Sequence, residues 1–298
     1  MALSTNLRGA VLMMAGMTSF TLSDACMKAI GTSMPLSQSL LLRGLAVTVI
    51  LGLVVWRAGT PTGLRRRDWA LMLLRALAES GAAWFFFLAL FQMPLANVSA
   101  VMQASPLTIA LAAWPVLGQR IGPRRILAIL GGLAGVLLIV RPGAEGWGWP
   151  VIAALGSVAC VTMRDLLSRS LAPEVPTLLV VLVTGAGVAL SGALGVPFQP
   201  DWVALEGRSL LLLGGTSVMV IGGYAGITAA MRSGEIGFVA PFRYTGLLVA
   251  VAVGALAFGT FPDPLTLLGA GVVVATGLFT LLREARQPRP EEAEAPGA

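Results

Sequence analysis

The chain alternates between long apolar runs and short polar clusters. Each run has roughly twenty residues, the length that an α-helix needs to cross about 30 Å of hydrocarbon. The clusters between the runs are short and rich in Arg, Pro and Gly, so consecutive runs are expected to lie antiparallel. The pattern predicts an all-α integral membrane protein with ten transmembrane helices, at residues 8–30, 35–57, 68–90, 94–118, 123–141, 148–170, 175–196, 207–231, 235–259 and 263–283.

Basic residues collect on one side of these predicted spans. The sparse side holds Lys28, Arg141 and Arg208, whereas the other side holds Arg8, Arg57, Arg65, Arg66, Arg67, Arg120, Arg124, Arg125, Arg169, Arg232, Arg283, Arg286 and Arg289. Because cytoplasmic loops carry the excess of Lys and Arg, both termini are expected to be cytoplasmic. We therefore expect a multi-pass protein of the cytoplasmic (inner) membrane.

The two halves of the chain share features in the same order. Asp24 precedes Lys28 by four residues in the first span, and Asp165 precedes Arg169 by four in the sixth. Since each half has five spans, an odd number, the second half enters the membrane with the opposite orientation. We predict a first repeat at 1–141, an inverted second repeat at 142–283 and a disordered cytoplasmic tail at 284–298. Inverted repeats are common in secondary transporters, which bind substrate between the halves near the midplane.

The amino-acid composition limits which catalytic groups, metal sites and partners the protein is expected to have. The chain is 56% hydrophobic and 11% charged and has no histidine, which removes imidazole metal ligands and His-based acid/base catalysis. Its two cysteines, Cys26 and Cys160, each lie inside an apolar run, so we expect no metal site, no disulfide framework and no cofactor. The net charge of +6 forms no contiguous basic face, which argues against nucleic acid as a partner. Glycine-rich stretches at 131–135 and 222–226 lack a following Gly-Lys-Ser or Gly-Lys-Thr, so we interpret them as helix-packing surfaces and not as phosphate loops.

Charged side chains nevertheless occur inside the predicted spans. Each costs about 2.5–3.5 kcal/mol on insertion scales, so these groups are expected to face the bundle interior and to have partners. By depth they fall into an outer cluster of Asp24, Lys28 and Arg43 and an inner cluster of Arg75, Glu79, Arg164, Asp165 and Arg243. These clusters would act either as opposing gates or as static ion pairs. The gating or ion-pair candidates are Asp24, Lys28, Arg43, Arg75, Arg164, Asp165 and Arg169.

Arg243 has a similar predicted depth to Glu79 and Arg75, which are four residues apart on one helical face. Arg243 would either complete a network with Glu79 or Asp165, or hold a substrate carboxylate. Pro106 and Pro241 interrupt spans four and nine and would act as hinges or as simple kinks. The predicted substrate-binding residues are Glu79 and Arg243 together with uncharged groups that would otherwise only pack or bind local carbonyls, namely Ser19, Trp84, Ser99, Gln103, Tyr224 and Tyr244.

Several segments resemble one known family. PLANVSAVMQASPL leading to LGQRIGPRRILAILGGLAGVLLIVRPG in the first half, and APFRYTGLL leading to FGTFPDPLTLLGAGVV in the second, are similar to the ten-helix EamA-type exporters of the drug/metabolite transporter superfamily, and specifically to the YddG-like amino-acid exporter branch. The resemblance implies a basket of helices around a central cavity, and export of amino acids or related metabolites by alternating access. The family often has Glu where this chain has Gln119 and Thr260, so a role for that acid is not expected here.

We therefore expect a secondary transporter, not an enzyme, that exports small metabolites, with amino acids, aromatic or otherwise apolar, as the expected class. The alternatives are a membrane-embedded lipid-modifying enzyme and a channel. The loop acids have no metal-binding spacing, and no ring of like charges or filter-like loop is present, which disfavours both. The expected partners are a small-molecule substrate and the lipid bilayer, and the protein is expected to be a monomer.

Overall fold

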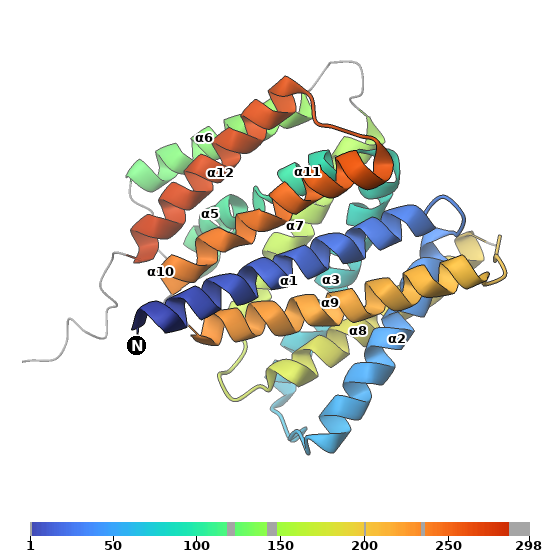
Figure 1. Cartoon of the computed structure of the whole chain (residues 1–298). Helices are drawn as coiled ribbons and strands as arrows, with labels where there is room; N and C mark the ends of the chain where they lie inside the picture. The colour runs from blue at the N-terminus through green and yellow to red at the C-terminus, as the bar shows by residue number, and fades with distance from the viewer. Residues whose placement is uncertain (1, 118–122, 142–147, 200, 234–235, 286–298) are drawn as a thin grey trace, which may run out of the picture.

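The computed structural model describes residues 2–117, 123–141, 148–199, 201–233 and 236–285, and within these ranges every regular element is helical (Figure 1). In chain order the elements are α1 (Ala2–Ile30), α2 (Leu36–Arg57), α3 (Arg66–Gln92), α4 (Leu95–Met102), α5 (Ser105–Leu117), α6 (Pro123–Val140), α7 (Trp149–Arg169), α8 (Thr177–Gly195), η1 (Val196–Phe198), α9 (Gly207–Ser233), α10 (Ile236–Val239), η2 (Ala240–Tyr244), α11 (Thr245–Phe258) and α12 (Pro264–Ala285).

The helix bounds follow the predicted spans closely, because the length of each apolar run determines where helix is needed. Eight segments of the described residues are long and apolar enough to cross a membrane. Apolar stretches of α6 and α12 are shorter, at Ile126–Val140 and Pro264–Phe279. The structure therefore shows a multi-pass helical protein, while ten crossings and the orientation of the termini stay predictions. The predicted tail at 284–298 overlaps the end of α12, which continues to Ala285, and its remainder lies outside the described residues.

Two predicted spans are interrupted helices. The fourth is divided into α4 and α5, which meet around Gln103, and Pro106 is the second residue of α5. The ninth consists of α10, the 3-10 turn η2 and α11, and Pro241 is the second residue of η2. Both prolines thus lie where regular α-helical geometry stops, as expected of a residue that lacks a backbone N–H. Whether either break acts as a hinge stays a prediction.

The helices pack mainly in pairs that combine an early segment with a late one. Figure 1 shows α1 beside α9 and α6 beside α12; α2 likewise packs on α8, α3 on α7, and α4 on α11. Glycines allow the closest approaches. A Cβ at Gly135 would lie 2.8 Å from the carbonyl oxygen of Gly269, and a Cβ at Gly269 would lie 2.6 Å from that of Gly135. These contacts require glycine, as the two glycine-rich stretches indicated.

Apolar side chains cover the outside of the bundle as well as its core. Leu211 and Leu256 are 78% and 88% exposed, whereas Leu40, Leu90 and Leu107 are fully buried. Large leucines facing outward along apolar helices are expected where lipid replaces water as the solvent.

The same contacts occur twice along the chain. The Ser23 hydroxyl on α1 donates to the Thr216 carbonyl on α9 at 3.1 Å, and the Ser157 hydroxyl on α7 donates to the Ala82 carbonyl on α3 at 3.0 Å. Ser23 and Ser157 are separated along the sequence by the same number of residues as Ala82 and Thr216, so a single shift of the residue numbers takes the first member of each pair to the second. The shift therefore relates the α1–α9 pair to the α7–α3 pair.

Two further contacts obey the same shift. It carries Cys26 to Cys160 and Gly81 to Gly215, and a Cβ at Gly215 would lie 3.6 Å from the Cys26 sulfur, while one at Gly81 would lie 3.2 Å from the Cys160 sulfur. It also carries Gly135 to Gly269, which contact each other. This register differs from the one that aligns Asp24 with Asp165. The matching segments, Ser-Asp-Ala-Cys and Ser-Val-Ala-Cys, are a sequence signal that the charge pattern obscured.

The N-terminus of α12 is capped by Asp263. Its carboxylate accepts the backbone N–H groups of Leu265 and Thr266 at 3.0 and 3.1 Å and the Thr266 hydroxyl at 2.8 Å, and it forms an ion pair with Arg141 at the end of α6. Partial desolvation acts to raise the pKa of Asp263, but the hydrogen bonds from Thr266 and Arg141 outweigh it and lower the pKa to about 2. This cap and ion pair join the ends of the α6–α12 pair.

Candidate functional site

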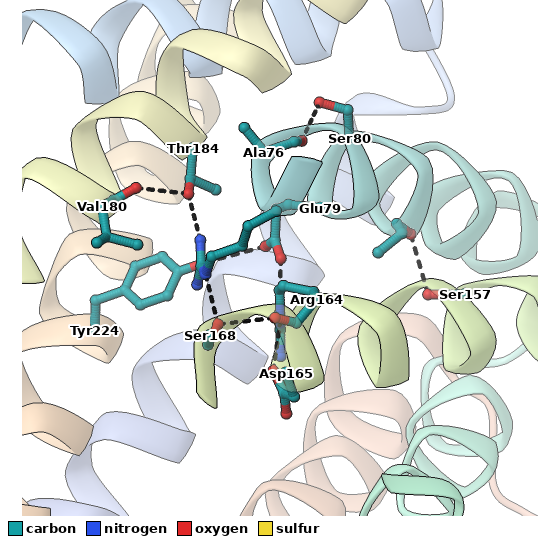
Figure 2. Close-up of polar contacts among 12 residues, drawn as sticks. Ala76, Glu79, Ser80, Ser157, Arg164, Asp165, Ser168, Val180, Thr184 and Tyr224 are labelled. Atoms are coloured by element: carbon teal, nitrogen blue, oxygen red, sulfur yellow. Dashed lines mark hydrogen bonds and ion pairs between the residues drawn. The ribbon is translucent and has the colours of Figure 1, made fainter. Parts of the chain in front are cut away.

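Glu79 on α3 is the centre of a charged cluster between three helices (Figure 2). One carboxylate oxygen accepts a guanidinium N–H of Arg164 on α7 at 2.8 Å, and the other accepts the hydroxyl of Tyr224 on α9 at 3.1 Å. The Nε of Arg164 donates to Asp165 on the same helix, also at 2.8 Å. One arginine is therefore shared by two carboxylates, and the carboxylate of Glu79 has both oxygens occupied.

Arg75 lies one helical turn before Glu79 on α3 and is held differently. Its Nε donates to the Ser168 hydroxyl on α7 at 2.7 Å, and another guanidinium nitrogen donates to the Thr184 hydroxyl on α8. Both hydroxyls also donate to carbonyls of their own helices, Arg164 and Val180, so their oxygens face the arginine as acceptors. The sequence analysis did not identify Ser168 and Thr184. Their depth, close to that of Arg75, was the available signal.

Arg243 is the cation of this region without a partner. It lies on η2, its side chain is exposed, and it makes no hydrogen bond or ion pair within the described part of the chain. The charges of Asp165 and Arg164 both act on it, with opposite signs, so Arg243 belongs to the same charged region as the cluster around Glu79. Of the two predicted alternatives, a completed ion pair with Glu79 or Asp165 is not what the structure shows. Binding of a substrate carboxylate stays a prediction.

A second polar cluster surrounds Arg43 on α2. One of its terminal nitrogens lies 3.5 Å from the Ser23 hydroxyl, the guanidinium lies 5.3 Å from the centroid of the Phe87 ring, and its charge interacts with that of Asp24 on α1. Ser23 itself is bonded to Thr216 on α9. The charge of Glu79 also acts on Arg43, so the two clusters belong to one electrostatic network.

Lys28 does not pair with Asp24 in the structure. Its ammonium donates to the carbonyls of Leu90 and Met93 at the end of α3, at 2.6 and 2.7 Å, and lies 5.7 Å from the centroid of the Phe258 ring on α11. A cation at the C-terminal end of a helix complements the carbonyls that have no partner within the helix. Lys28 therefore joins α1, α3 and α11. Arg169, at the end of α7, is exposed.

Three of the predicted substrate-binding residues contact neighbouring helices. Ser19 donates to the Met219 carbonyl on α9 at 2.8 Å, and the Trp84 indole donates to the Ser191 hydroxyl on α8 at 3.2 Å. The Tyr244 hydroxyl is buried against Gly277 of α12 and has no hydrogen-bond partner in the described chain. These contacts are those of the packing alternative, and a substrate role for the three residues stays a prediction.

Ser99 and Gln103 lie at the end of α4, beside the break between α4 and α5. Both are half-buried, and within the described residues neither side chain makes a hydrogen bond. Gln103 thus presents an amide with free donor and acceptor groups next to an interrupted helix, an arrangement that is used to line binding sites in membrane carriers.

Comparison with known proteins assigns the fold and the family. Residues 7–141 match the model of the EamA-like transporter family. The chain is 30% identical to a riboflavin transporter of Rhizobium johnstonii, over 80% of this chain and 76% of that protein, and 29% identical to the aromatic amino acid exporter YddG of Ancylobacter novellus, over 78% and 84%. A solved crystal structure with 21% sequence identity covers 97% of this chain and 100% of that one with a TM-score of 0.66, which shows a shared fold.

Proposed function

The chain belongs to the EamA-like transporter family, within the drug/metabolite transporter superfamily, and from this premise we propose that it is a secondary carrier that exports amino acids or related small metabolites. The expected substrates have an aromatic or otherwise apolar side chain. Arg243 binds their carboxylate. The similarity to an aromatic amino acid exporter favours this class, while the similarity to riboflavin transporters supports small-metabolite transport in general.

The observation that carries the proposal is the unpaired state of Arg243. Glu79 and Arg164 satisfy each other, and Arg75 has two hydroxyl acceptors, whereas the exposed guanidinium of Arg243 has no acceptor in the described chain. A cation at this depth is costly without a counter-charge. A carboxylate supplies that charge and matches the planar donor fork of arginine.

Transport by alternating access needs two halves that move relative to each other. The repeated contacts support a pair of five-helix halves, which we propose to be inverted, because one shift along the sequence maps α1 onto α7 and α3 onto α9 and so carries the α1–α9 pair onto the α7–α3 pair. The bonds from Arg164 and Tyr224 to Glu79 join the two proposed halves, and so does the contact of Lys28 with Phe258. We propose that these contacts open and close alternately on the two sides of the substrate.

The test compares Arg243→Gln and Arg243→Lys with Arg57→Gln, which changes an exposed arginine at the end of α2. Purified protein in liposomes is assayed for saturable counterflow of L-phenylalanine, and thermal stability is measured in detergent. We expect Arg243→Gln to weaken apparent affinity by about tenfold or more, the value of one charge-assisted contact, without lowering Tm. Arg243→Lys should lose less, and Arg57→Gln should behave like the parent.

Unchanged affinity in a folded Arg243→Gln variant would reject the carboxylate role. Flux that neither saturates nor shows counterflow would favour a channel, and chemical conversion of the added compound would favour an enzyme.

A further inference from the structure

Arg243 lies between two aromatic residues of η2, Phe242 and Tyr244, that pack in different directions. We propose that Tyr244 is a positioning residue for substrate binding: its ring fits into a notch at Gly277 of α12 and thereby fixes the direction in which Arg243 points. The inference rests on the proposed function, since it concerns the arginine that takes the substrate carboxylate. It gives α12 a part in determining affinity through Arg243, without a substrate contact of its own.

The contact between Tyr244 and Gly277 depends on the absence of a side chain at Gly277. A Cβ at this position would overlap the Tyr244 hydroxyl and would lie 3.0 Å from the Cζ atom of its ring. Tyr244 is only 8% exposed, so the ring is enclosed where it meets α12. Glycine is therefore the only residue type at position 277 that accepts the ring in this place.

The Tyr244 hydroxyl contributes no hydrogen bond to this contact. Its oxygen is buried and has no partner among the described residues, although a buried hydroxyl without a partner costs free energy. The fit therefore comes from the ring, and a phenylalanine at position 244 is expected to occupy the same notch. The role that this geometry assigns to Tyr244 is packing that orients its neighbour in the chain.

Phe242 anchors η2 on the other side of Arg243. It packs against a buried cluster of α1, α9 and α10 that includes Met13 and Val239. Tyr244 instead packs against α12, and Figure 1 shows the segment of α10 and α11 between α1 and α12. A 3-10 helix has about three residues per turn, so three consecutive side chains point about 120° apart. With both neighbours held by different helices, Arg243 has one direction left, in which its side chain is exposed.

The start of α11 is held against α1 as well. The Thr21 hydroxyl on α1 donates to the Gly246 carbonyl at 3.2 Å, and a Cβ at Gly246 would lie 2.8 Å from the Cε of Met17. The segment therefore has no room to retreat towards α1 if the notch at Gly277 is filled. The displacement falls on η2, which carries Arg243.

The test measures apparent affinity for L-phenylalanine by counterflow in liposomes, with Tm in detergent as the measure of folding. Gly277→Ala fills the notch, and Gly271→Ala on the same helix is the matched control, because a Cβ there meets nothing within 4 Å. We expect Gly277→Ala to weaken apparent affinity by about threefold to tenfold, up to the value of the contact that Arg243 makes. Gly271→Ala should leave the affinity unchanged.

Substitutions at Tyr244 test the fit from the other side. Tyr244→Phe alone should keep the affinity of the parent. When Tyr244→Phe is combined with Gly277→Ala, the new methyl group takes the place of the missing hydroxyl, so most of the lost affinity should return. Tyr244→Ala removes the ring without filling the notch and should lose affinity as Gly277→Ala does. It carries the same test if Gly277→Ala fails to fold.

The decisive readout is a double-mutant cycle with Arg243→Gln. If Tyr244 acts through Arg243, adding Gly277→Ala or Tyr244→Ala to Arg243→Gln causes no further loss of affinity, whereas general damage to the site adds a loss of its own.

Three results would overturn the positioning role: losses that add in this cycle, the affinity of the parent in a folded Tyr244→Ala variant, or a loss of affinity in Tyr244→Phe alone. Each of them leaves the proposed function intact as long as Arg243→Gln by itself weakens affinity. An Arg243→Gln variant that binds like the parent would overturn both.

Discussion

Arg164 on α7 lies 2.8 Å from the Glu79 carboxylate on α3, and the same guanidinium holds Asp165 at 2.8 Å. Two carboxylates thus share one guanidinium, and Tyr224 adds a third helix, α9, to the cluster. The carboxylates of Glu79 and Asp165, which are costly in an apolar helix bundle, are therefore both neutralised by Arg164.

Replacing Glu79 with Leu should destabilise the protein strongly, because Arg164 would lose its inter-helix partner while remaining partly buried. Breaking a buried ion pair from one side costs about 3–5 kcal/mol, and the partial exposure of both groups places the expected loss at the low end. The measurement is Tm in detergent. Tyr224→Phe removes one hydrogen bond and keeps the ion pair, so a smaller loss is expected. Equal Tm values for the parent and Glu79→Leu would contradict the structural role given to this pair.

The paired contacts predict two disulfide cross-links that use the native cysteines. Gly215→Cys should cross-link to Cys26 and join α9 to α1, and Gly81→Cys should cross-link to Cys160 and join α3 to α7, because the two native sulfurs lie 3.6 and 3.2 Å from the new Cβ atoms. Mild oxidation followed by mass spectrometry of peptides would detect each bond. Gly214→Cys is the control, since a Cβ there meets nothing within 4 Å. A cross-link from Gly214→Cys but from neither of the other variants would show that the helices have a different register.

Two glycines of α12 should respond differently to the same substitution. Gly269→Ala places a Cβ 2.6 Å from the Gly135 carbonyl and should push α12 away from α6, with a lower Tm. Gly271→Ala meets nothing within 4 Å and should be neutral or stabilising by about 0.5–1 kcal/mol, because alanine favours helix. If the two variants had the same Tm, the α6–α12 interface would not be as close as described.

Asp263 predicts a pH dependence at the N-terminus of α12. Its pKa is lowered from 3.8 to about 2, so its stabilising contribution is complete above pH 4 and is lost as the pH falls towards 2. Asp263→Asn keeps an N-cap but loses the ion pair with Arg141, and should remove this acid-dependent component of Tm. Asp263→Ala should lose the cap as well, at a cost of about 1 kcal/mol. A Tm profile between pH 2 and 5 that is identical in the parent and in Asp263→Asn would rule out this contribution.

The sequence predicted the helix bounds well because length and hydropathy determine where a chain crosses lipid. It predicted the third span at 68–90, and α3 runs from Arg66 to Gln92. It also placed Arg75, Glu79, Arg164 and Asp165 at a common depth, and Arg164 does contact both acids.

The direction in which side chains point was less accessible. Trp84 was a candidate for the cavity; the rotation of α3 brings its indole to Ser191 on α8, a contact that the sequence did not predict, and a role in the cavity stays a prediction. Lys28 was grouped with Asp24 by spacing, yet the exposed carbonyls at the end of α3 attract its ammonium. Such choices depend on how neighbouring helices are rotated about their axes, which residue spacing along a single helix does not encode.

The way in which Arg75 and Arg164 are held also bears on energetics across the membrane. Because Ser168, Thr184 and Glu79 anchor both guanidiniums to helices, their charges belong to the scaffold and do not travel with a substrate. Membrane voltage does about 2.3 kcal/mol of work per elementary charge per 100 mV only on charge that crosses the field. A substrate whose two charged groups cancel would then move at a rate insensitive to voltage, whereas a singly charged cargo would not.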